Sequence, residues 1–189
     1  RKAVGDGVEA VLAPAKGLPE NILLGLKKLL TLPNPPDRFL IVTTDLPYLD
    51  EKVLIKWLDT VPDADFCGPL VTEEDYMERF PGSSSTFAKL RDGSFTLGGA
   101  YVVRTEALRR CMPQIEKAIA SRKNVAAMAS LLGIGFLVRV MTRRATLAEI
   151  EAKVCQVLGA SVKAVPDSPP ELAFDIDDIA DYEYALRNN

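Results

Sequence analysis

Histidine is absent from the chain, and its three cysteines, Cys67, Cys111 and Cys155, stand far apart in the sequence. A zinc site of the usual kind needs clustered cysteine or histidine ligands, so the composition excludes one. Catalysis by a Ser-His-Asp or a Cys-His arrangement is excluded as well. Any catalytic chemistry must therefore rest on carboxylates, lysines, arginines, backbone amides or metal ions.

The chain also lacks a long basic run, and its formal net charge is −3. Nucleic-acid-binding proteins normally show a basic face, so we expect no nucleic-acid partner. The longest uncharged, largely apolar run is Val125–Val138, whose 14 residues include two glycines. Such a run is too short to cross a bilayer, and we expect no membrane partner. Isolated cysteines in odd number fit a reducing compartment, which predicts a cytoplasmic protein.

Segments with the patterns of strands and of helices alternate along the 189 residues. This alternation predicts a single domain over residues 1–189 with an α/β fold, a three-layer α/β/α sandwich built on a mostly parallel sheet. The patterns predict strands within 8–14, 39–44, 63–72 and 161–166, and a hairpin over 86–104 with its turn at Asp92-Gly93. They predict helices over 19–30, 50–61, 105–120, 146–158 and most of 123–141, and short helical segments after residue 72 and at the C-terminus.

Acidic residues follow two of the predicted strands. The stretch "FLIVTTDLPYLD" ends a buried strand on Asp45, and "AFDIDDIADY" places Asp175, Asp177 and Asp178 after the last strand. In parallel α/β sheets, ligands bind at the carboxyl ends of the strands, so these acids could converge on one hard cation such as Mg²⁺. Each acid has a plainer interpretation, because aspartates also begin helices by capping them.

Three stretches resemble the motif series of the MobA-like nucleotidyltransferases: "FLIVTTDLPYLD", "TLGGAYVVR" and "FDIDDIADYEYAL". This family of NTP transferases includes molybdenum-cofactor guanylyltransferase. The resemblance implies a GT-A fold of the nucleotide-diphospho-sugar transferase type, which is Rossmann-like. It also implies a Mg²⁺-dependent enzyme that moves a nucleoside monophosphate from a nucleoside triphosphate to a phosphate-bearing or related small-molecule acceptor and releases pyrophosphate.

The resemblance also implies roles for single residues. Asp45 and Asp177 would be the catalytic metal ligands, with Asp175 as the alternative to Asp177, because Asp178 and Ile179 replace the family's threonine and proline after the motif. The nucleotide-binding and acceptor-binding residues would lie at the start of "GLPENILLGL", before Asp45 and in "TLGGAY". The nucleotide-binding set is Gly17, Glu20, Asn21 and Thr44, and the acceptor-binding pair is Gly98 and Gly99.

The family's glycine-rich phosphate loop has no counterpart in this sequence, because Gly5-Asp6-Gly7 is too short and lacks the Arg-x-Gly continuation. We expect that the chain as given lacks its N-terminal region, and the alternative is a protein that has lost this loop and its catalysis. Two other functions stay open. One is a GT-A glycosyltransferase that uses a nucleotide-sugar, although Thr-Asp-Leu-Pro replaces Asp-x-Asp. The other is a non-catalytic nucleotide-binding or scaffold module.

Two features remain outside these motifs. The apolar segment Leu131–Met141 is either a subunit interface, which would make the protein a homo-oligomer, or part of the core. Arg139, Arg143 and Arg144 follow or end this segment, and they form either a patch for an acidic ligand or a solvated helix end.

Overall fold

The computed structural model describes residues 10–121 and 124–188. The chain forms two compact units, residues 1–37 and 38–189. The smaller unit contains α1 (Leu18–Leu30), which begins after Gly17 and has a proline in its first turn, where a missing N–H costs no helical hydrogen bond. Residues 10–14 form neither helix nor strand, so the strand predicted over 8–14 is wrong over its described part; Val8 and Glu9 lie outside the described residues. Whether the two units act as the single domain predicted from length stays a prediction.

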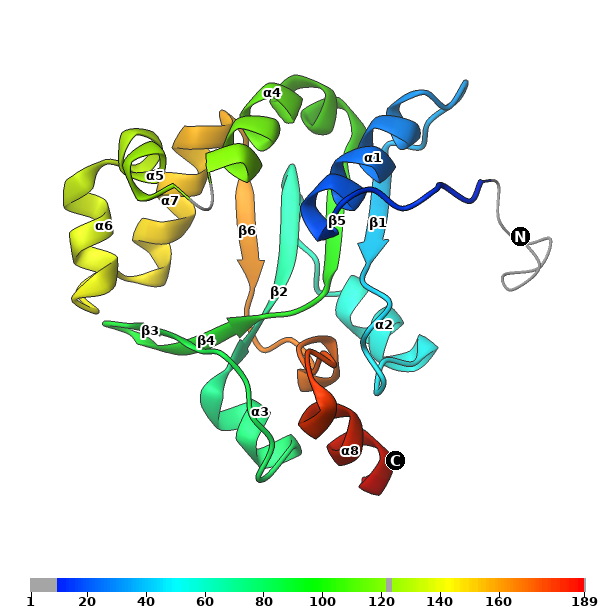
Figure 1. Cartoon of the computed structure of the whole chain (residues 1–189), viewed down its shortest axis with the longest axis vertical. Coiled ribbons are helices and arrows are strands. Elements are labelled where there is room, and N and C mark those ends of the chain that lie inside the picture. The colour runs from blue at the N-terminus through cyan, green and yellow to red at the C-terminus, as the bar shows by residue number, and fades with distance from the viewer. Residues whose placement is uncertain (1–9, 122–123, 189) are drawn as a thin grey trace. The chain divides into compact units, whose positions relative to one another are not determined.

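The larger unit holds the whole sheet (Figure 1). Its elements, in chain order, are β1 (Arg38–Val42), α2 (Glu51–Leu58), β2 (Phe66–Thr72), α3 (Glu73–Arg79), β3 (Ala88–Leu90), β4 (Gly93–Leu97), β5 (Ala100–Arg104), α4 (Thr105–Ser121), α5 (Val125–Leu132), α6 (Ile134–Met141), α7 (Leu147–Leu158), β6 (Val162–Val165), the 3₁₀ turn η1 (Pro170–Leu172) and α8 (Ile179–Arg187).

The six-stranded sheet has the order β1-β5-β2-β4-β3, with β6 paired to β2. Only the β2–β6 pair is parallel, and the other described pairs are antiparallel. The predicted mostly parallel, Rossmann-like sheet is therefore wrong, although the protein is α/β. The cause is β5, which follows the β3–β4 hairpin and runs back between β1 and β2, pairing Leu40 with Val102 on one side and Cys67 with Val102 on the other.

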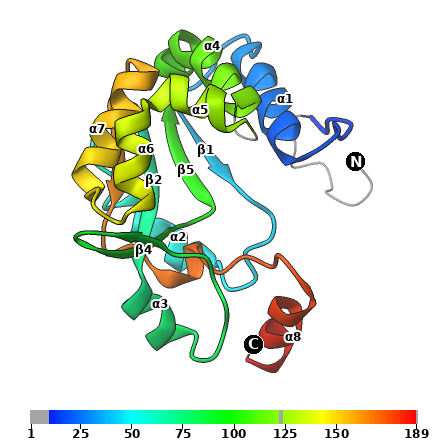
Figure 2. The same ribbon diagram turned by 60° about the vertical axis from the view of Figure 1, so that its left-hand side comes forward.

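The directions of the strands bring distant parts of the chain together at one end of the sheet. This end, where the C-termini of three strands lie, is called the carboxyl edge of the sheet. Because β5 is antiparallel to both β1 and β2, and β6 is parallel to β2, the strands β1, β2 and β6 all point the same way. Their carboxyl ends share an edge of the sheet with the beginning of β5 (Figure 2). The segments after β1 and after β6 therefore approach each other at this edge.

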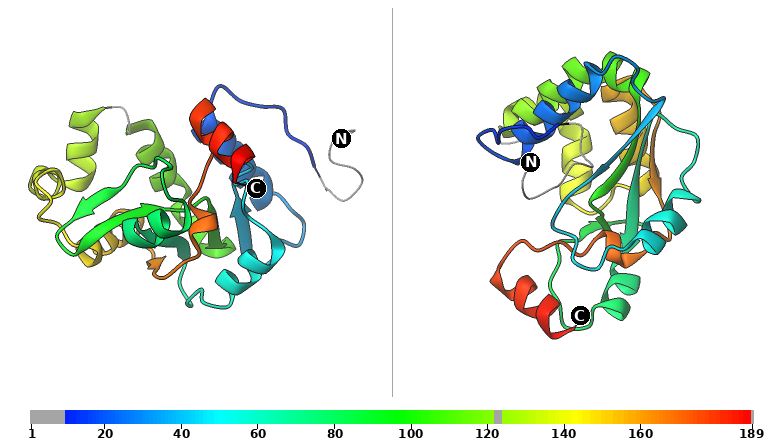
Figure 3. Two further views of the ribbon diagram at one scale, coloured as in Figure 1. Left: turned by 90° about the horizontal axis from the view of Figure 1, so that it is seen from below. Right: turned by 90° about the vertical axis from the view of Figure 1, so that its right-hand side faces the viewer.

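Two apolar clusters hold the larger unit together. In the first, the fully buried Trp57 of α2 packs with Cys67, Ala100 and Val102 on one face of the sheet. The second is aromatic and lies around α3, α8 and the segment before α8; its ring contacts join Tyr48, Tyr76, Phe80, Phe87, Phe174 and Tyr184. The helices α2 and α4 lie on opposite faces of the sheet (Figure 3).

Local signals place the helix boundaries. Asp50 begins α2 by accepting a hydrogen bond from the Val53 N–H at 2.8 Å. The predicted helix over 146–158 is present as α7: Thr146 and Glu149 form a capping box at its start, and Gly159 ends it in a left-handed conformation with φ 67°. The segment 123–141, predicted to be mostly helical, contains two helices, since Gly133 separates α5 from α6. Among the described residues, none of the helices is long and apolar enough to cross a membrane.

Candidate functional site

Asp45 lies beyond the end of β1, in a turn that buries the neighbouring Leu46 and leaves Asp45 exposed. The following helix, α2, is capped by Asp50, so the interpretation of Asp45 as its cap is wrong. Within the described residues, the Asp45 carboxylate makes no hydrogen bond and no ion pair. A carboxylate at a strand end without a protein partner is available for a ligand or a cation.

Backbone hydrogen bonds fasten three segments together at this edge of the sheet. The Thr43 N–H donates to the Gly99 carbonyl at 2.8 Å, and the Gly99 N–H donates to the Leu172 carbonyl at 2.7 Å. The Ile176 N–H then donates to the Asp45 carbonyl at 3.0 Å. Asp175 and Asp177 flank Ile176, so the structure brings the acids predicted from the two strand ends to the same place.

The acids at this edge act on one another electrostatically. The pKa of Asp175 is raised chiefly by partial burial of its carboxyl group, then by the negative charge of Asp177, with smaller contributions from Asp45 and Asp181. A hydrogen bond from its own backbone acts in the opposite direction. Neighbouring like charges make the ionised form costly, and a bound cation or proton would relieve that cost.

Oxygen is the only kind of donor atom that these acids offer. In the part of the chain that the structure describes, no group of three acidic or thiol side chains lies close enough to hold a metal ion unaided. Magnesium is usually bound by one or two carboxylates together with substrate phosphates and waters, rather than by an all-protein cage. Asp45 with Asp175 or Asp177 fits a magnesium ion that arrives with a phosphate ligand.

The remaining acids of the C-terminal motif are helix caps. The Asp178 carboxylate accepts hydrogen bonds from the Ala180 N–H at 2.7 Å and the Asp181 N–H at 3.1 Å. Asp181 in return accepts from the N–H groups of Asp177 and Asp178, which completes a capping box for α8. The capping interpretation is therefore correct for Asp178. The side chains of Asp175 and Asp177 do not cap α8.

The packing around positions 98 and 99 leaves no room for a side chain. A Cβ atom at Gly98 would collide with the Leu172 carbonyl oxygen, and one at Gly99 would collide with the Thr43 hydroxyl. Both glycines thus allow the start of β5 to pack against the segments after β1 and β6. Their predicted contact with an acceptor stays a prediction, although they lie at the edge that carries the acids.

Tyr101 is a site residue that the sequence argument missed. It lies two residues after Gly99 on β5, is 36% exposed, and its ring covers Gly68, where a Cβ atom would meet the ring carbons at 3.0 and 3.1 Å. Burial and the negative charge of Asp175 raise its pKa, which keeps the phenol neutral. The alternation of strand side chains was the available signal, because it places Tyr101 and Val103 on the face opposite the core residues Ala100 and Val102.

Three of the four predicted nucleotide-binding residues, Gly17, Glu20 and Asn21, belong to the smaller unit. The Gly17 carbonyl accepts from the Asn21 N–H at 2.9 Å, and the Asn21 side-chain oxygen accepts from the Ala15 N–H at 2.6 Å. Glu20 is exposed in the first turn of α1. Thr44, in the larger unit, is exposed next to Asp45. The roles of these four residues in nucleotide binding stay predictions, and Gly5-Asp6-Gly7 lies outside the described residues.

Comparison with known proteins gives one informative match. No protein-family model and no curated protein matches the chain. A solved structure of a hypothetical transferase from Thermus thermophilus matches 93% of this chain and 73% of its own length, with 31% sequence identity and a TM-score of 0.80. The chain belongs to the family of that hypothetical transferase. Membership of this family supports a general transferase activity for this chain, and therefore a role as an enzyme. The narrower assignment to the MobA-like nucleotidyltransferases stays a proposal.

Proposed function

We propose that this protein is a Mg²⁺-dependent nucleotidyltransferase of the MobA-like kind. One observation carries the proposal: the Ile176–Asp45 backbone hydrogen bond joins the ends of two distant segments and sets Asp45 beside Asp175 and Asp177. The Asp45 carboxylate, which has no hydrogen bond or ion pair within the described residues, and the acids Asp175 and Asp177 of the segment after η1 fit the binding of a metal–triphosphate complex. The family likeness to a hypothetical transferase supports the same reading.

In the proposed reaction, an oxygen of a phosphate-bearing or related small-molecule acceptor attacks the α-phosphorus of a nucleoside triphosphate. A new P–O bond forms, the bond from the α-phosphorus to the oxygen bridging the β-phosphate breaks, and pyrophosphate leaves with that bridging oxygen. A phosphate acceptor is already ionised, so the step needs no histidine base. Positioning and neutralisation of charge supply most of the catalysis in such transfers.

Asp45 and Asp177 would hold the magnesium ion, with Asp175 as the alternative ligand. Bound Mg²⁺ would supply neutralisation of the triphosphate charge. The Tyr101 ring, near Asp175 and a third exposed, would face the acceptor from the sheet. We propose a cytoplasmic protein whose partners are the triphosphate and the acceptor rather than a nucleic acid.

The test is a thermal-shift screen of the full-length protein against four nucleoside triphosphates and a set of nucleotide-sugars, each with and without Mg²⁺. A ligand present at a hundred times its Kd adds about 2.7 kcal/mol, which raises the Tm by several degrees in a domain of this size. We expect a Mg²⁺-dependent shift with one triphosphate in the wild-type protein and none in Asp45→Ala. The matched control Asp50→Ala, which removes the α2 cap, should lower the Tm and keep the ligand shift.

The other functions are distinguished by the same screen. A shift with nucleotide-sugars alone would replace the proposal by a glycosyltransferase. A triphosphate shift that occurs without turnover of any acceptor would indicate a binding module. A lack of any Mg²⁺-dependent shift, together with an unchanged profile for Asp45→Ala, would contradict the metal site itself.

A further inference from the structure

The helix α6 is almost wholly apolar and yet has no buried residue. Ile134, Val138 and Met141 are 71%, 51% and 82% exposed. Their spacing of four and three residues places them on one stripe of the helix. The exposure of large apolar side chains to water is unfavourable, and exposed apolar patches usually mark interaction sites. We therefore expect this face of α6 to bind a partner.

The helix pair α5–α6 lies at the periphery of the 38–189 unit, beyond α7, and no element of that unit lies outside it (Figures 1 and 3). The side chains on the inner face of α6 supply its packing, as Phe136 does against Lys153 of α7, whose ammonium nitrogen lies 5.6 Å from the ring centroid. The exposed stripe is therefore the outward face of α6 with respect to its own unit.

The segment that carries the stripe has charged side chains of one sign, and the acids that contact it, Glu149 and Asp92, come from outside it. Residues 121–148 contain no aspartate and no glutamate, although the whole chain has a net charge of −3. Arg139, Arg143 and Arg144 are exposed at or just beyond the end of α6. Arg139 is paired with Glu149, whereas Arg143 and Arg144 form no ion pair within the described residues. The surface thus combines an apolar stripe with uncompensated positive charge.

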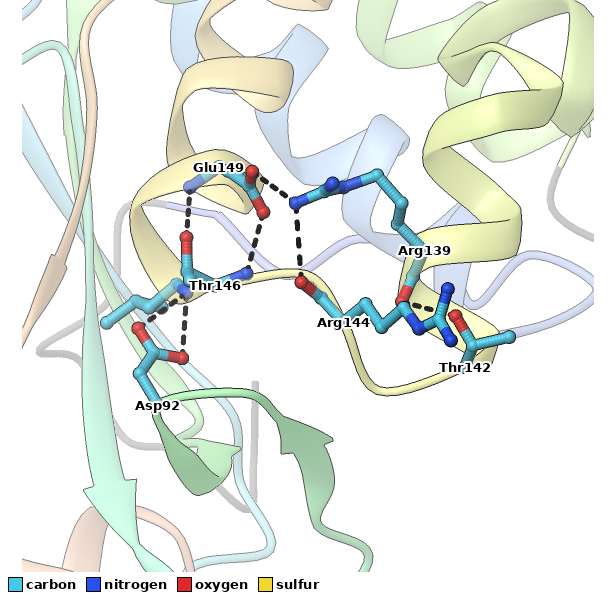
Figure 4. Close-up of polar contacts among 7 residues, drawn as sticks. Asp92, Arg139, Thr142, Arg144, Thr146 and Glu149 are labelled. Atoms are coloured by element: carbon cyan, nitrogen blue, oxygen red, sulfur yellow. Dashed lines mark hydrogen bonds and ion pairs between the residues drawn. The ribbon is translucent and has the colours of Figure 1, made fainter.

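Hydrogen bonds hold this surface in place (Figure 4). The Arg139 guanidinium donates to Glu149 on α7 and, at 3.3 Å, to the Arg144 carbonyl. The loop after α6 is also tied to the β3–β4 hairpin, because the Arg91 N–H donates to the Ala145 carbonyl at 2.9 Å. The cations therefore sit on a fixed loop beside the apolar stripe.

Arg143 adopts a left-handed backbone conformation with φ 57°. Glycine occupies that conformation without strain, whereas a residue with a side chain pays a cost. Arginine at a position where glycine would be more stable points to a use for its side chain.

We propose that the stripe Ile134, Val138 and Met141, with Arg143 and Arg144, docks the protein peripherally on an anionic lipid surface. A helix in the interfacial plane inserts apolar side chains while neighbouring cations meet the lipid headgroups. A second copy fits less well, because a two-fold contact would bring together two copies of the cations Arg143 and Arg144, which form no ion pair within the described residues. The expectation of no membrane partner rested on the lack of a spanning segment, and peripheral docking needs none.

The experiment is sedimentation of the full chain with vesicles of phosphatidylcholine alone or with about a third phosphatidylserine, in low and high salt. We expect at least about ten-fold stronger partitioning into the anionic vesicles, and loss of that preference in high salt. Each arginine near the surface is worth roughly five-fold in partitioning. Arg143→Gly should lower binding by about that factor while keeping or raising the Tm, because glycine suits this backbone.

Met141→Ser tests the apolar stripe, and Lys52→Ala, which removes an exposed cation on α2, serves as the matched control. Met141→Ser should weaken vesicle binding, and Lys52→Ala should leave it unchanged. Equal binding to both vesicle types, or wild-type binding by Arg143→Gly, would overturn the proposal. So would a concentration-dependent dimer that Met141→Ser dissociates, because the stripe would then be an interface between copies.

Discussion

At the scale of single residues, neighbouring aspartates have different surroundings. The Asp178 carboxylate accepts two backbone N–H groups at the start of α8, whereas no such donor reaches the Asp177 side chain within the described residues. The Asp178 carboxylate already has its hydrogen bonds within the protein, and the Asp177 carboxylate is available to a cation. One residue of displacement along the chain therefore separates a structural acid from a candidate catalytic one.

This difference predicts opposite effects of two substitutions. Asp178→Ala should lower the free energy of unfolding by about 0.5–2 kcal/mol through loss of the cap, and should keep Mg²⁺-dependent triphosphate binding. Asp177→Ala should keep most of the stability and lose the binding. Urea unfolding and ligand-induced thermal shifts measure the two properties separately. The assignment fails if Asp178→Ala is the variant that loses binding.

Gly98 gives a second prediction at this scale. A Cβ atom there would meet the Leu172 carbonyl oxygen and the Pro69 ring, neither of which can move cheaply. Gly98→Ala should therefore destabilise the protein by about 1–3 kcal/mol in urea unfolding. Gly135→Ala is the matched control, because no atom outside its neighbourhood lies within 4 Å of its Cβ position. That control should be neutral or stabilising by up to about 1 kcal/mol, and equal losses in both variants would contradict the packing argument.

The sequence predicted Asp45 as a site residue because an apolar strand ending on an acid is a local signal, although β1 is an edge strand in which only Phe39 is buried. Tyr101 was not predicted, because its exposure depends on which strand lies beside β5 and on the lack of a side chain at Gly68. Likewise, the sequence left Asp175 as the alternative to Asp177, and it did not show which acid of the motif caps α8, since spacing alone does not show which carboxylate the helix N–H groups face.

At the scale of secondary-structure elements, the start of α7 shows how an ion pair supports a helix. The pKa of Glu149 is lowered by the hydrogen bond from Arg139 and then by that from the Thr146 N–H. A carboxyl group with a lowered pKa in the folded state stabilises the protein above its unfolded pKa. That contribution is lost as the pH falls through the folded pKa.

Glu149→Gln should therefore lower the Tm at pH 7, and the difference from the wild type should begin to shrink below the usual glutamate pKa of about 4.3 and vanish below the lowered folded pKa. Thermal unfolding followed by circular dichroism between pH 3 and pH 8 would measure this. Gln156→Glu, on the same helix but outside the capping box, serves as a control. A difference that persists unchanged at low pH would show that the ionised carboxylate is not the stabilising group.

Helix boundaries in this chain were largely predictable because their signals are local. The capping box of α7, the left-handed Gly159 and the break at Gly133 all lie within a few residues of the boundary they set. Strand 8–14 was predicted wrongly over residues 10–14, since an alternating pattern forms a strand only where a partner strand accepts its hydrogen bonds.

At the scale of the whole molecule, sheet order was not predictable from the pattern of elements. The insertion of β5 between β1 and β2 depends on pairings between residues more than thirty positions apart, such as Cys67 with Val102. No local signal reports such a pairing. The two acidic segments nevertheless meet, through the hydrogen bond from the Ile176 N–H to the Asp45 carbonyl, and β1 and β6 point the same way even though they do not pair. That their carboxylates bind one cation stays a prediction.

The distribution of the core predicts how the molecule unfolds. Every residue of the two apolar clusters, and every described strand, belongs to residues 38–189. In the other unit, α1 has 13 residues, a length at which an isolated helix is marginal in water. Among the described residues, every buried hydrophobic residue except Leu26 of α1 belongs to the larger unit, so most of the stabilising burial lies there.

We therefore expect residues 38–189, produced alone, to unfold cooperatively with a Tm within a few degrees of that of the whole chain, and residues 1–37 alone to show little helix. Circular dichroism during thermal and urea unfolding would measure both fragments. A matched variant, Trp57→Ala, should cost about 3–5 kcal/mol in the whole chain and in the 38–189 fragment alike, because its neighbours are the same in both. A fragment that binds hydrophobic dyes and unfolds without a cooperative transition would show that residues 1–37 complete the core.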